Sequence, residues 1–153
     1  MKLKNKPAGL VKVVVYALLL LVFGLAAYQG VDRDDASVVT SNAGGVETIE
    51  RAFQQRQSKV WVEVQGNAVR LLPDDNDGSR HQRFILKIAS GRTLLVAHNI
   101  DLAPHVPLSA NDVLSLRGRY EWNEKGGVLH WTHHDPNGRI AGGWIEYQGK
   151  RYQ

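Results

Sequence analysis

Cysteine is absent from this chain of 153 residues. Its absence excludes disulfide bonds, thiol nucleophiles and cysteine-ligated metal sites. The sequence also lacks a G-x-S-x-G motif, and Ser90, Ser109 and Ser115 have no histidine and aspartate neighbours in the sequence that would suggest a catalytic serine. A chain of this length is typical of one domain. Any catalysis would therefore depend on histidine as a base, with arginine to stabilise developing negative charge.

An excess of positive charge is also absent from the body of the chain. Four lysines precede the first acidic residue, Asp32, and the remaining 15 Lys and Arg balance 15 Asp and Glu. The basic isoelectric point is therefore a property of the N-terminal tail. Non-specific binding to nucleic acid requires clustered cationic charge. We expect no strong non-specific nucleic-acid binding by the body of the protein.

The longest apolar run lies near the N-terminus, where Val13–Ala27 contains no charged side chain. Signal-peptide cores span roughly 7–15 residues and membrane helices roughly 17–25 residues, and this run lies between the two classes. Counted back through Lys12 to Gly9, it reaches the length of a membrane span. We predict that residues 1–28 are a signal anchor, which crosses the membrane as a helix, or alternatively a cleaved signal peptide.

The charges on either side of the apolar run predict its orientation. Lysines precede it and aspartates follow it closely, and the positively charged side of a membrane helix stays in the cytoplasm. In a Gram-negative bacterium the protein would span the inner membrane once, with its C-terminal domain in the periplasm. If the segment is cleaved, the protein would be periplasmic. The membrane is thus an expected partner through the N-terminal helix.

Two segments of different character follow. Residues 29–45 are mostly small and polar, which predicts a flexible linker. Residues 46–57 then place four apolar side chains at helical spacing: Val46, Ile49, Ala52 and Phe53. We expect a short amphipathic helix whose apolar stripe closes one end of a sheet or barrel.

From residue 60 onward, polar and apolar residues alternate, which is the period of a half-buried β-strand. Five strands are predicted at residues 60–72 (with a bulge or bend at Gly66), 81–88, 92–98, 113–122 and 128–132. The last two form a hairpin around a turn at residues 123–127. Residues 99–110 are a long connection without helical periodicity, and a small hairpin at residues 144–152 covers an edge of the sheet.

The order of these elements predicts the fold class. A long bent strand, its hairpin partner, a third strand, a long connection and a hairpin match the OB-fold, a five-stranded barrel. An immunoglobulin-like sandwich requires about seven strands, more than the body offers. We therefore predict a mainly β protein in which an N-terminal membrane helix precedes a domain at residues 46–153. In that domain a short leading helix precedes an OB-like five-stranded small barrel.

Four sequence blocks carry a family resemblance: RHQRF from Arg80, LLVAHNIDLAP from Leu94, YEWNEKGGVLHWTHHDP from Tyr120 and GWIEYQGKRYQ from Gly143. On these blocks the chain from about residue 46 to its end resembles a family of small exported bacterial proteins catalogued only as a domain of unknown function. The resemblance implies a cell-envelope setting. It implies no activity and no catalytic residues.

Candidate site residues lie at strand ends and on outward strand faces. We predict that His98, His134 and Asp135 converge where two strands leave the barrel. Asp135 would orient one imidazole and leave the other free for a ligand or a metal. The other ligand-binding candidates are His81, Arg83, His130 and Trp61.

The tryptophans and histidines each have a plainer interpretation. Trp122 and Trp131 fall on the apolar faces of their strands and are expected in the core, whereas Trp61 lies opposite a valine stripe and is the better ligand candidate. A straight strand would separate His130 from His134 by roughly 13 Å, too far to share an ion. A chelate would require the chain to curl after the strand, so metal, cofactor and catalytic residues stay unknown.

Three functions remain open. The sequence favours a cell-envelope binding module, tethered to the membrane, whose ligand is a small anionic molecule, an oligomer or a partner protein. An envelope phosphodiesterase or nuclease would use His98, His134 and Asp135 near Arg83. A structural assembly factor would have no small-molecule site. A cavity between Arg83 and the two histidines would favour the enzyme, and a flat, filled barrel face would favour the assembly factor.

Overall fold

The computed structural model describes the backbone of residues 33–153 and the side chains of residues 42–153. The predicted membrane segment at residues 1–28 lies outside the described residues. Among the helices of the described part, none combines the length and the apolar character needed to cross a membrane. Residues 37–153 form one compact unit, which contains all the described strands.

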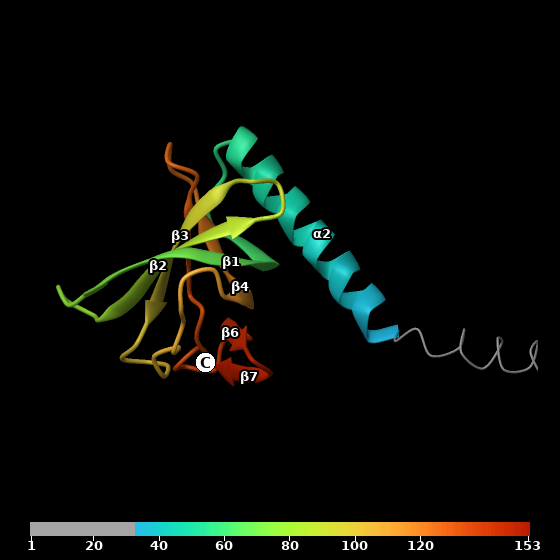
Figure 1. Ribbon diagram of the computed structural model, residues 1–153. Coiled ribbons are helices and arrows are strands. Elements are labelled where there is room, and N and C mark those ends of the chain that lie inside the picture. The colour runs from blue at the N-terminus through green and yellow to red at the C-terminus, as the bar shows by residue number, and fades with distance from the viewer. Residues whose placement is uncertain (1–32) are drawn as a thin grey trace, which may run out of the picture. The chain divides into compact units, whose positions relative to one another are not determined.

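The described chain is mainly β, with a helix before a ring of five strands (Figure 1). Helix α2 spans Arg33–Gln54, and the strands are β1 Val60–Asp75, β2 His81–Ile88, β3 Thr93–Asn99, β4 Val113–Glu121, β5 Val128–His130, β6 Trp144–Tyr147 and β7 Lys150–Tyr152. The strand order is β1-β2-β3-β5-β4-β6-β7, and β1 also pairs with β4, so the first five strands close on themselves. The β3–β5 pairing is parallel and the other pairings are antiparallel. The predicted mainly β architecture with a helix before five strands is confirmed.

Strand β1 closes the ring because it pairs along both of its edges. Its first half pairs with β4 as far as Asn67, and its second half pairs with β2 from Gly66 onward. A Cβ atom at Gly66 would lie 2.6 Å from the carbonyl oxygen of Lys87, so a larger residue would push the two strands apart. Gly66 is thus the corner of the strand, while the first register shift lies between Ala68 and Arg70.

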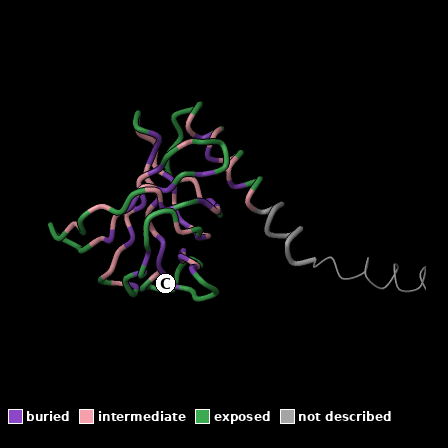
Figure 2. The backbone as a smooth tube through the Cα atoms, viewed as in Figure 1, coloured by how far each residue is buried: buried purple, intermediate pink, exposed green. Residues whose placement is uncertain are grey.

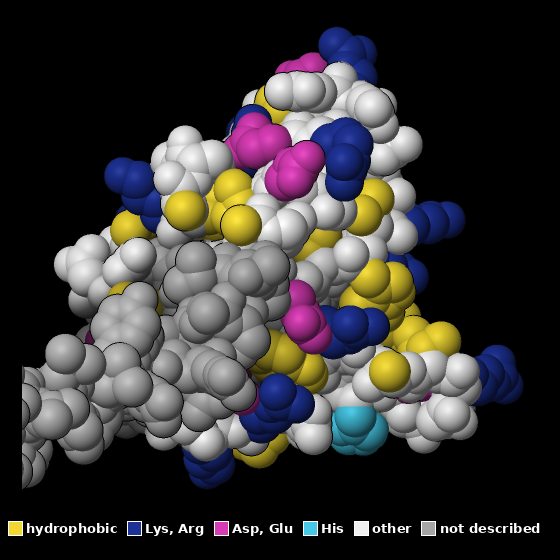
Figure 3. Space-filling model, turned by 90° about the vertical axis from the view of Figure 1, so that its right-hand side faces the viewer, with side chains coloured by type: hydrophobic (Ala, Val, Ile, Leu, Met, Phe, Trp, Pro, Cys, Tyr) yellow, Lys and Arg dark blue, Asp and Glu magenta, His cyan; other side chains and the backbone are white. Residues whose placement is uncertain are grey.

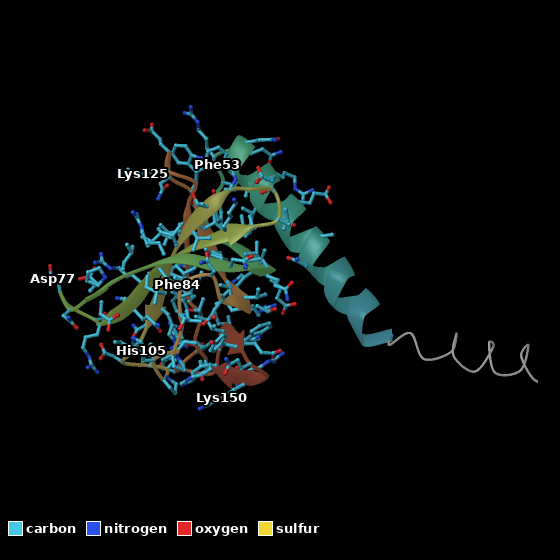
Figure 4. All side chains as sticks on the ribbon, viewed as in Figure 1. Phe53, Asp77, Phe84, His105, Lys125 and Lys150 are labelled. Atoms are coloured by element: carbon cyan, nitrogen blue, oxygen red, sulfur yellow. The ribbon has the colours of Figure 1, made fainter. Side chains whose placement is uncertain are left out.

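The predicted alternation places the core inside the ring, and buried and exposed positions follow each other along the strands in Figure 2. On β2 and β3 the buried residues are Gln82, Phe84, Leu86, Ile88, Leu94, Val96 and His98. Phe84 lies in the middle of the ring of strands, whereas Asp77 lies at the far tip of the β1–β2 turn (Figure 4). Full burial of a side chain such as Phe84 stabilises the fold by about 1.5–3 kcal/mol.

Helix α2 contributes one stripe to the same core. Ile49 and Ala52 are 0% and 1% exposed, and both belong to the core cluster. A Cβ atom at Gly45 would overlap the carbonyl oxygen of Glu63, so the helix lies directly against β1 at this glycine. The helix begins at Arg33, not at Val46, and residues 33–45 of the predicted linker are helical. The small and polar residues suggested a linker, but packing against the sheet overrides the low helix propensity of Gly44 and Gly45.

One edge of β4 pairs with β1, and two short strands share its other edge. β5 pairs with residues 119–121 of β4, and β6 pairs with residues 115–117. Between them residues 131–143 leave the sheet and return to it; we refer to these residues as the excursion loop. Strand β5 ends before Trp131, which has a φ of 56°. The prediction that Trp131 belongs to the core is wrong, because this turn leaves its ring partly exposed, whereas Trp122 packs against the core.

Candidate functional site

A pocket of about 300 Å³ lies on the outer face of β2, β3 and β5, beside the excursion loop. Its lining residues come from the ends of three strands, from the connection after β3 and from the loop. They are His81, Ala97, Asn99, Leu102, His130, Trp131, His133, Asp135, Pro136 and Asn137. Three imidazoles, an indole, amides and a carboxylate therefore converge on one hollow.

The hollow exists because Ala97 is small. His81 lies opposite Asn99 on β2 and β3, and the parallel register of β3 and β5 brings His130 to the other side of Ala97. These side chains point away from the core, because their chain neighbours on each strand are the buried ones. A methyl group between larger side chains makes a floor, and the imidazoles and the amide make the walls.

Asp135 shapes the excursion loop. Its carboxylate accepts hydrogen bonds from the backbone N–H groups of Asn137, Arg139 and Ile140 at 3.2, 2.7 and 3.2 Å. These hydrogen bonds, that of Asn137 first, lower the pKa of Asp135. Asp135 therefore holds a turn together and does not orient an imidazole, which corrects the role predicted for it.

Gly142 and Gly143 close the loop against β4. The Arg117 Nε donates to the carbonyl oxygen of Gly142 at 3.0 Å, and the amide of Gly143 donates to the carbonyl oxygen of His133 at 2.8 Å. A Cβ atom at Gly143 would overlap the carbonyl oxygens of Trp131 and Arg117. Only glycine lets three backbone segments meet here, and their meeting positions the loop beside the pocket.

His133 is held in one tautomer beside Trp131. Its Nδ1 lies 2.7 Å from the carbonyl oxygen of His134. Because a carbonyl oxygen only accepts, Nδ1 donates and Nε2 of the neutral ring is an acceptor. The ring stacks on Trp131, with centroids 5.4 Å apart and an angle of 24° between the planes. The two rings form an aromatic wall that carries a hydrogen-bond acceptor.

His130 is oriented by a hydrogen bond of its own. Its Nε2 lies 3.2 Å from Oε1 of Glu121, and a carboxylate oxygen accepts, so Nε2 donates and Nδ1 is an acceptor. Burial lowers the pKa of His130 more than the hydrogen bond to Glu121 raises it. At neutral pH the pocket therefore presents acceptor nitrogens rather than positive charge at His130.

His98 has a structural position outside the pocket. Its ring is 0% exposed, with Nδ1 2.8 Å from the Thr132 hydroxyl and Nε2 3.1 Å from the carbonyl oxygen of Pro104. Burial lowers the pKa of His98 to about 4. Both ring nitrogens are already hydrogen-bonded, so His98 joins the end of β3 to the excursion loop and to the long connection.

The structure brings together only part of the predicted site. Of the seven candidates, His81, His130 and Asp135 line the pocket. His134 is exposed and is not among the residues that line the pocket. His98 meets the excursion loop at Thr132 and not at His134 or Asp135, since both of its ring nitrogens are hydrogen-bonded elsewhere. His133, not His134, lines the pocket, and it is the buried member of the pair.

The two remaining candidates lie on other surfaces. Arg83 donates from Nε and Nη2 to the carbonyl oxygen of Pro73, both at 3.1 Å, and lies 3.6 Å from Asp75. Trp61 lies on the outer face of β1 beneath the Arg117 guanidinium, 5.2 Å from its carbon to the ring centroid. Among the described residues, no group of three or more His, Asp or Glu side chains is placed to hold a metal ion.

Sequence reasoning did not select four side chains that matter to the pocket: Ala97, Asn99, Trp131 and His133. Alternation alone assigns Ala97 to the outward face but cannot show that a small residue there opens a hollow, and Asn99 falls in the predicted connection after the strand. The Gly142-Gly143 pair before the final hairpin is the signal that could have indicated a tightly closed loop.

One of two comparisons with known proteins identifies the family of the chain. No curated protein matches it. A family profile described as "Protein of unknown function (DUF3465)" matches residues 36–153, which include most of α2, all the strands and every residue of the pocket. The predicted membership of a family catalogued as a domain of unknown function is thereby confirmed. The chain belongs to this family, DUF3465.

Proposed function

We propose that this protein is a ligand-binding module of the cell envelope, built on an OB-like barrel and tethered to the membrane by its N-terminal segment. The observation that carries the proposal is the pocket of about 300 Å³ on the outer face of β2, β3 and β5. A hollow with convergent polar groups and an aromatic wall is the usual form of a binding site. A filled, flat face, as expected of an assembly factor, is not what these strands present.

The position of the pocket supports the proposal. OB-fold barrels bind oligonucleotides and oligosaccharides on the face of their second and third strands. The pocket lies on that face, between His81 of β2 and Asn99 of β3. This analogy between folds supports a location for binding and does not identify the ligand.

The chemistry of the lining supports a class of ligand. His130 and His133 offer acceptor nitrogens, Asn99 offers an amide, and Trp131 offers part of its ring. Among the described residues, no Lys or Arg lines the pocket, so an anion would meet no fixed positive charge. A ligand with hydroxyl or amide donors and a flat apolar face suits this lining better than a small anion.

The cellular setting rests on the N-terminal sequence. The lysines before the apolar run and the aspartates after it support a single-pass inner-membrane protein with its domain in the periplasm. Cleavage would release the same domain into the periplasm. A phosphodiesterase or nuclease is the weaker proposal, because Arg83, His98 and His134 do not share a cavity.

Filling the pocket tests the proposal. Isothermal titration of the full chain with neutral oligosaccharides, mononucleotides and amino acids should identify at least one class that binds. Ala97→Leu should abolish that binding, because the longer side chain occupies the hollow while pointing away from the core. His134→Ala is the matched control, since His134 is exposed next to the site, and it should bind as the wild type does. If no probe binds, or if Ala97→Leu binds normally while its thermal unfolding is unchanged, the proposal is wrong.

A further inference from the structure

A second surface begins at the edge of the pocket and crosses the outer face of β1, β4, β6 and β7. It consists of three tryptophans and three arginines: Trp61, Trp131, Trp144, Arg117, Arg119 and Arg151. We refer to it as the tryptophan–arginine face. Each arginine lies over one tryptophan ring and also pairs with one glutamate, so the same arrangement occurs three times.

The first two groups share one geometry. Arg117 on β4 lies directly opposite Glu63 on β1, with 3.6 Å between the charged atoms. Its guanidinium carbon is 5.2 Å from the ring centroid of Trp61, which precedes Glu63 by two residues on the same strand. Arg151 lies opposite Glu146 in the same way. Their atoms are 2.8 Å apart, and the Arg151 guanidinium carbon is 4.3 Å from the centroid of Trp144, again two residues along.

The third group connects the face to the pocket. Arg119 lies 3.2 Å from Glu121, and its guanidinium carbon is 5.1 Å from the centroid of Trp131, which lines the pocket. The sheet register places Trp61 directly opposite Arg119 and Trp144 directly opposite Arg117. The three groups are therefore neighbours on one continuous surface.

The face ends in a second hollow. A space of about 220 Å³ lies between α2 and the sheet, and the side chains around it include Trp144, Glu146, Arg151, Gln65 and Asn42. Amide, carboxylate and guanidinium groups there offer both donors and acceptors. A surface that joins two polar hollows through exposed indole rings suits an elongated ligand better than a compact one.

The stability of the fold does not explain this arrangement. The arginine side chains of the three groups are 34%, 27% and 53% exposed, and ion pairs at such exposure contribute little, about 1 kcal/mol at most. All three tryptophan rings stay partly exposed, although indole rings are among the side chains that gain most from burial. Partly exposed aromatic rings beside oriented polar groups are typical of recognition surfaces.

Charge balance decides the class of ligand. Three guanidinium groups face three carboxylates, so the face has no net charge from these pairs. A polyanion such as single-stranded nucleic acid gains affinity from an excess of cations, which is missing here. Figure 3 shows one face of the molecule, on which basic, acidic and hydrophobic side chains are interspersed. A neutral chain of sugar units can use guanidinium donors and carboxylate acceptors for its hydroxyls, and indole faces for its C–H groups.

We propose that the ligand is a neutral glycan chain, whose end occupies the pocket and whose following units lie along the tryptophan–arginine face. The proposal rests on the proposed function, because the pocket is one end of this surface. Neighbouring strands are about 4.8 Å apart, which is comparable to the length of one pyranose unit. Successive units can therefore contact successive strands.

The test measures affinity as a function of chain length. The full chain, kept in a micelle of a detergent without sugar groups, is titrated with β-1,4-linked oligomers of glucose and of N-acetylglucosamine of increasing length. Affinity should increase with length until the face is covered. Trp61→Ala and Trp144→Ala should each weaken binding of the longest oligomer about threefold to tenfold and leave binding of the shortest unchanged. Leu71→Ala is the matched control, because Leu71 is an exposed apolar residue of β1 (42%) outside the face.

The outcomes separate this inference from the proposed function. If Ala97→Leu blocks oligomers of every length and the two tryptophan variants affect only long ones, both proposals hold. If the tryptophan variants bind long oligomers as the wild type does, or if only non-saccharide probes bind the pocket, the glycan inference fails and the binding module stands. Tighter binding of an oligothymidylate than of a saccharide of similar length would also overturn the inference. If nothing binds, both proposals are wrong.

Discussion

Protonation of His98 should destabilise the domain in mild acid, because its ring is buried and neutral in the folded state. The carbonyl oxygen of Pro104, 3.1 Å away, accepts from Nε2, so Nδ1 accepts from the Thr132 hydroxyl at 2.8 Å. A second proton on this ring would place a charge in the interior without a carboxylate partner. Burial, the largest cause, accordingly lowers the pKa of His98 to about 4.

The sign and the size follow from the pKa in the two states. In the unfolded chain His98 has its ordinary pKa of 6.5, so below that pH the unfolded state binds a proton that the folded state does not. The free energy of unfolding therefore decreases as the pH falls from about 6.5 to about 4. The pKa difference corresponds to about 3 kcal/mol, a large part of the roughly 5–15 kcal/mol typical of a domain.

Urea unfolding at a series of pH values measures this loss. The comparison is between the wild type and His98→Gln, whose amide can donate to Pro104 and accept from Thr132. The substitution itself should destabilise by about 1 kcal/mol at neutral pH through imperfect geometry. Between about pH 7 and pH 4.5 the wild type should then lose about 2–3 kcal/mol more than the variant. Carboxylates with lowered pKa, such as Asp112 and Glu121, titrate in both proteins, so the difference isolates His98.

Parallel curves would refute the reasoning. If the wild type and His98→Gln lose the same free energy of unfolding across this range, His98 does not exclude a proton in the folded state. A direct NMR titration of the His98 ring would refute it equally if the ring became protonated near pH 6.5 in the folded protein.

Two further predictions concern stability. Gly44→Ala should raise the free energy of unfolding by about 0.5–1 kcal/mol, because alanine favours the helix and a Cβ there meets no atom within 4 Å. Gly45→Ala should instead destabilise the domain by about 1–3 kcal/mol, because its Cβ overlaps the carbonyl oxygen of Glu63. Thermal unfolding of the two variants measures both effects. Equal effects on stability would contradict the packing of α2 against β1. Gln82→Leu should destabilise by about 1–3 kcal/mol for each backbone group left unpaired, because Gln82 donates to the carbonyl oxygen of Val106 at 2.7 Å and accepts from its amide at 2.9 Å. An unchanged urea midpoint for Gln82→Leu would show that Val106 finds other partners.

Most strands could be predicted from the sequence because burial on one face of a strand follows a local rule. Phe84 and Leu86 are buried and their neighbours face outward, as the period of two requires. The sequence predicts a final hairpin at residues 144–152, and β6 and β7 occupy it. The helix start was not predictable in the same way, since Gly44 and Gly45 disfavour a helix locally. The close approach of Gly45 to β1 is a contact with a residue far along the chain.

The candidate site could be predicted only in part, for the same reason. His81 and His130 lie on outward strand faces, and alternation identifies both. A strand that continued past residue 130 would favour His134 over His133 as the site residue. The left-handed φ of Trp131 ends the strand. After it, the position of a residue in the sequence no longer indicates whether its side chain faces the core or the solvent.

The sequence by itself determined which residues form strands, which of their faces are apolar, and that no excess charge covers the body. Those properties depend on side chains a few residues apart, so local spacing expresses them. Only the tertiary structure decided that Ala97 forms the floor of a pocket, that His133 lines it, and that the tryptophan–arginine face adjoins it. Each of these three features depends on segments far apart in the sequence. They are brought together by the closure of the strand ring and by the contact of Gly142 and Gly143 with β4. Such contacts form because the whole chain folds, and no local pattern encodes them.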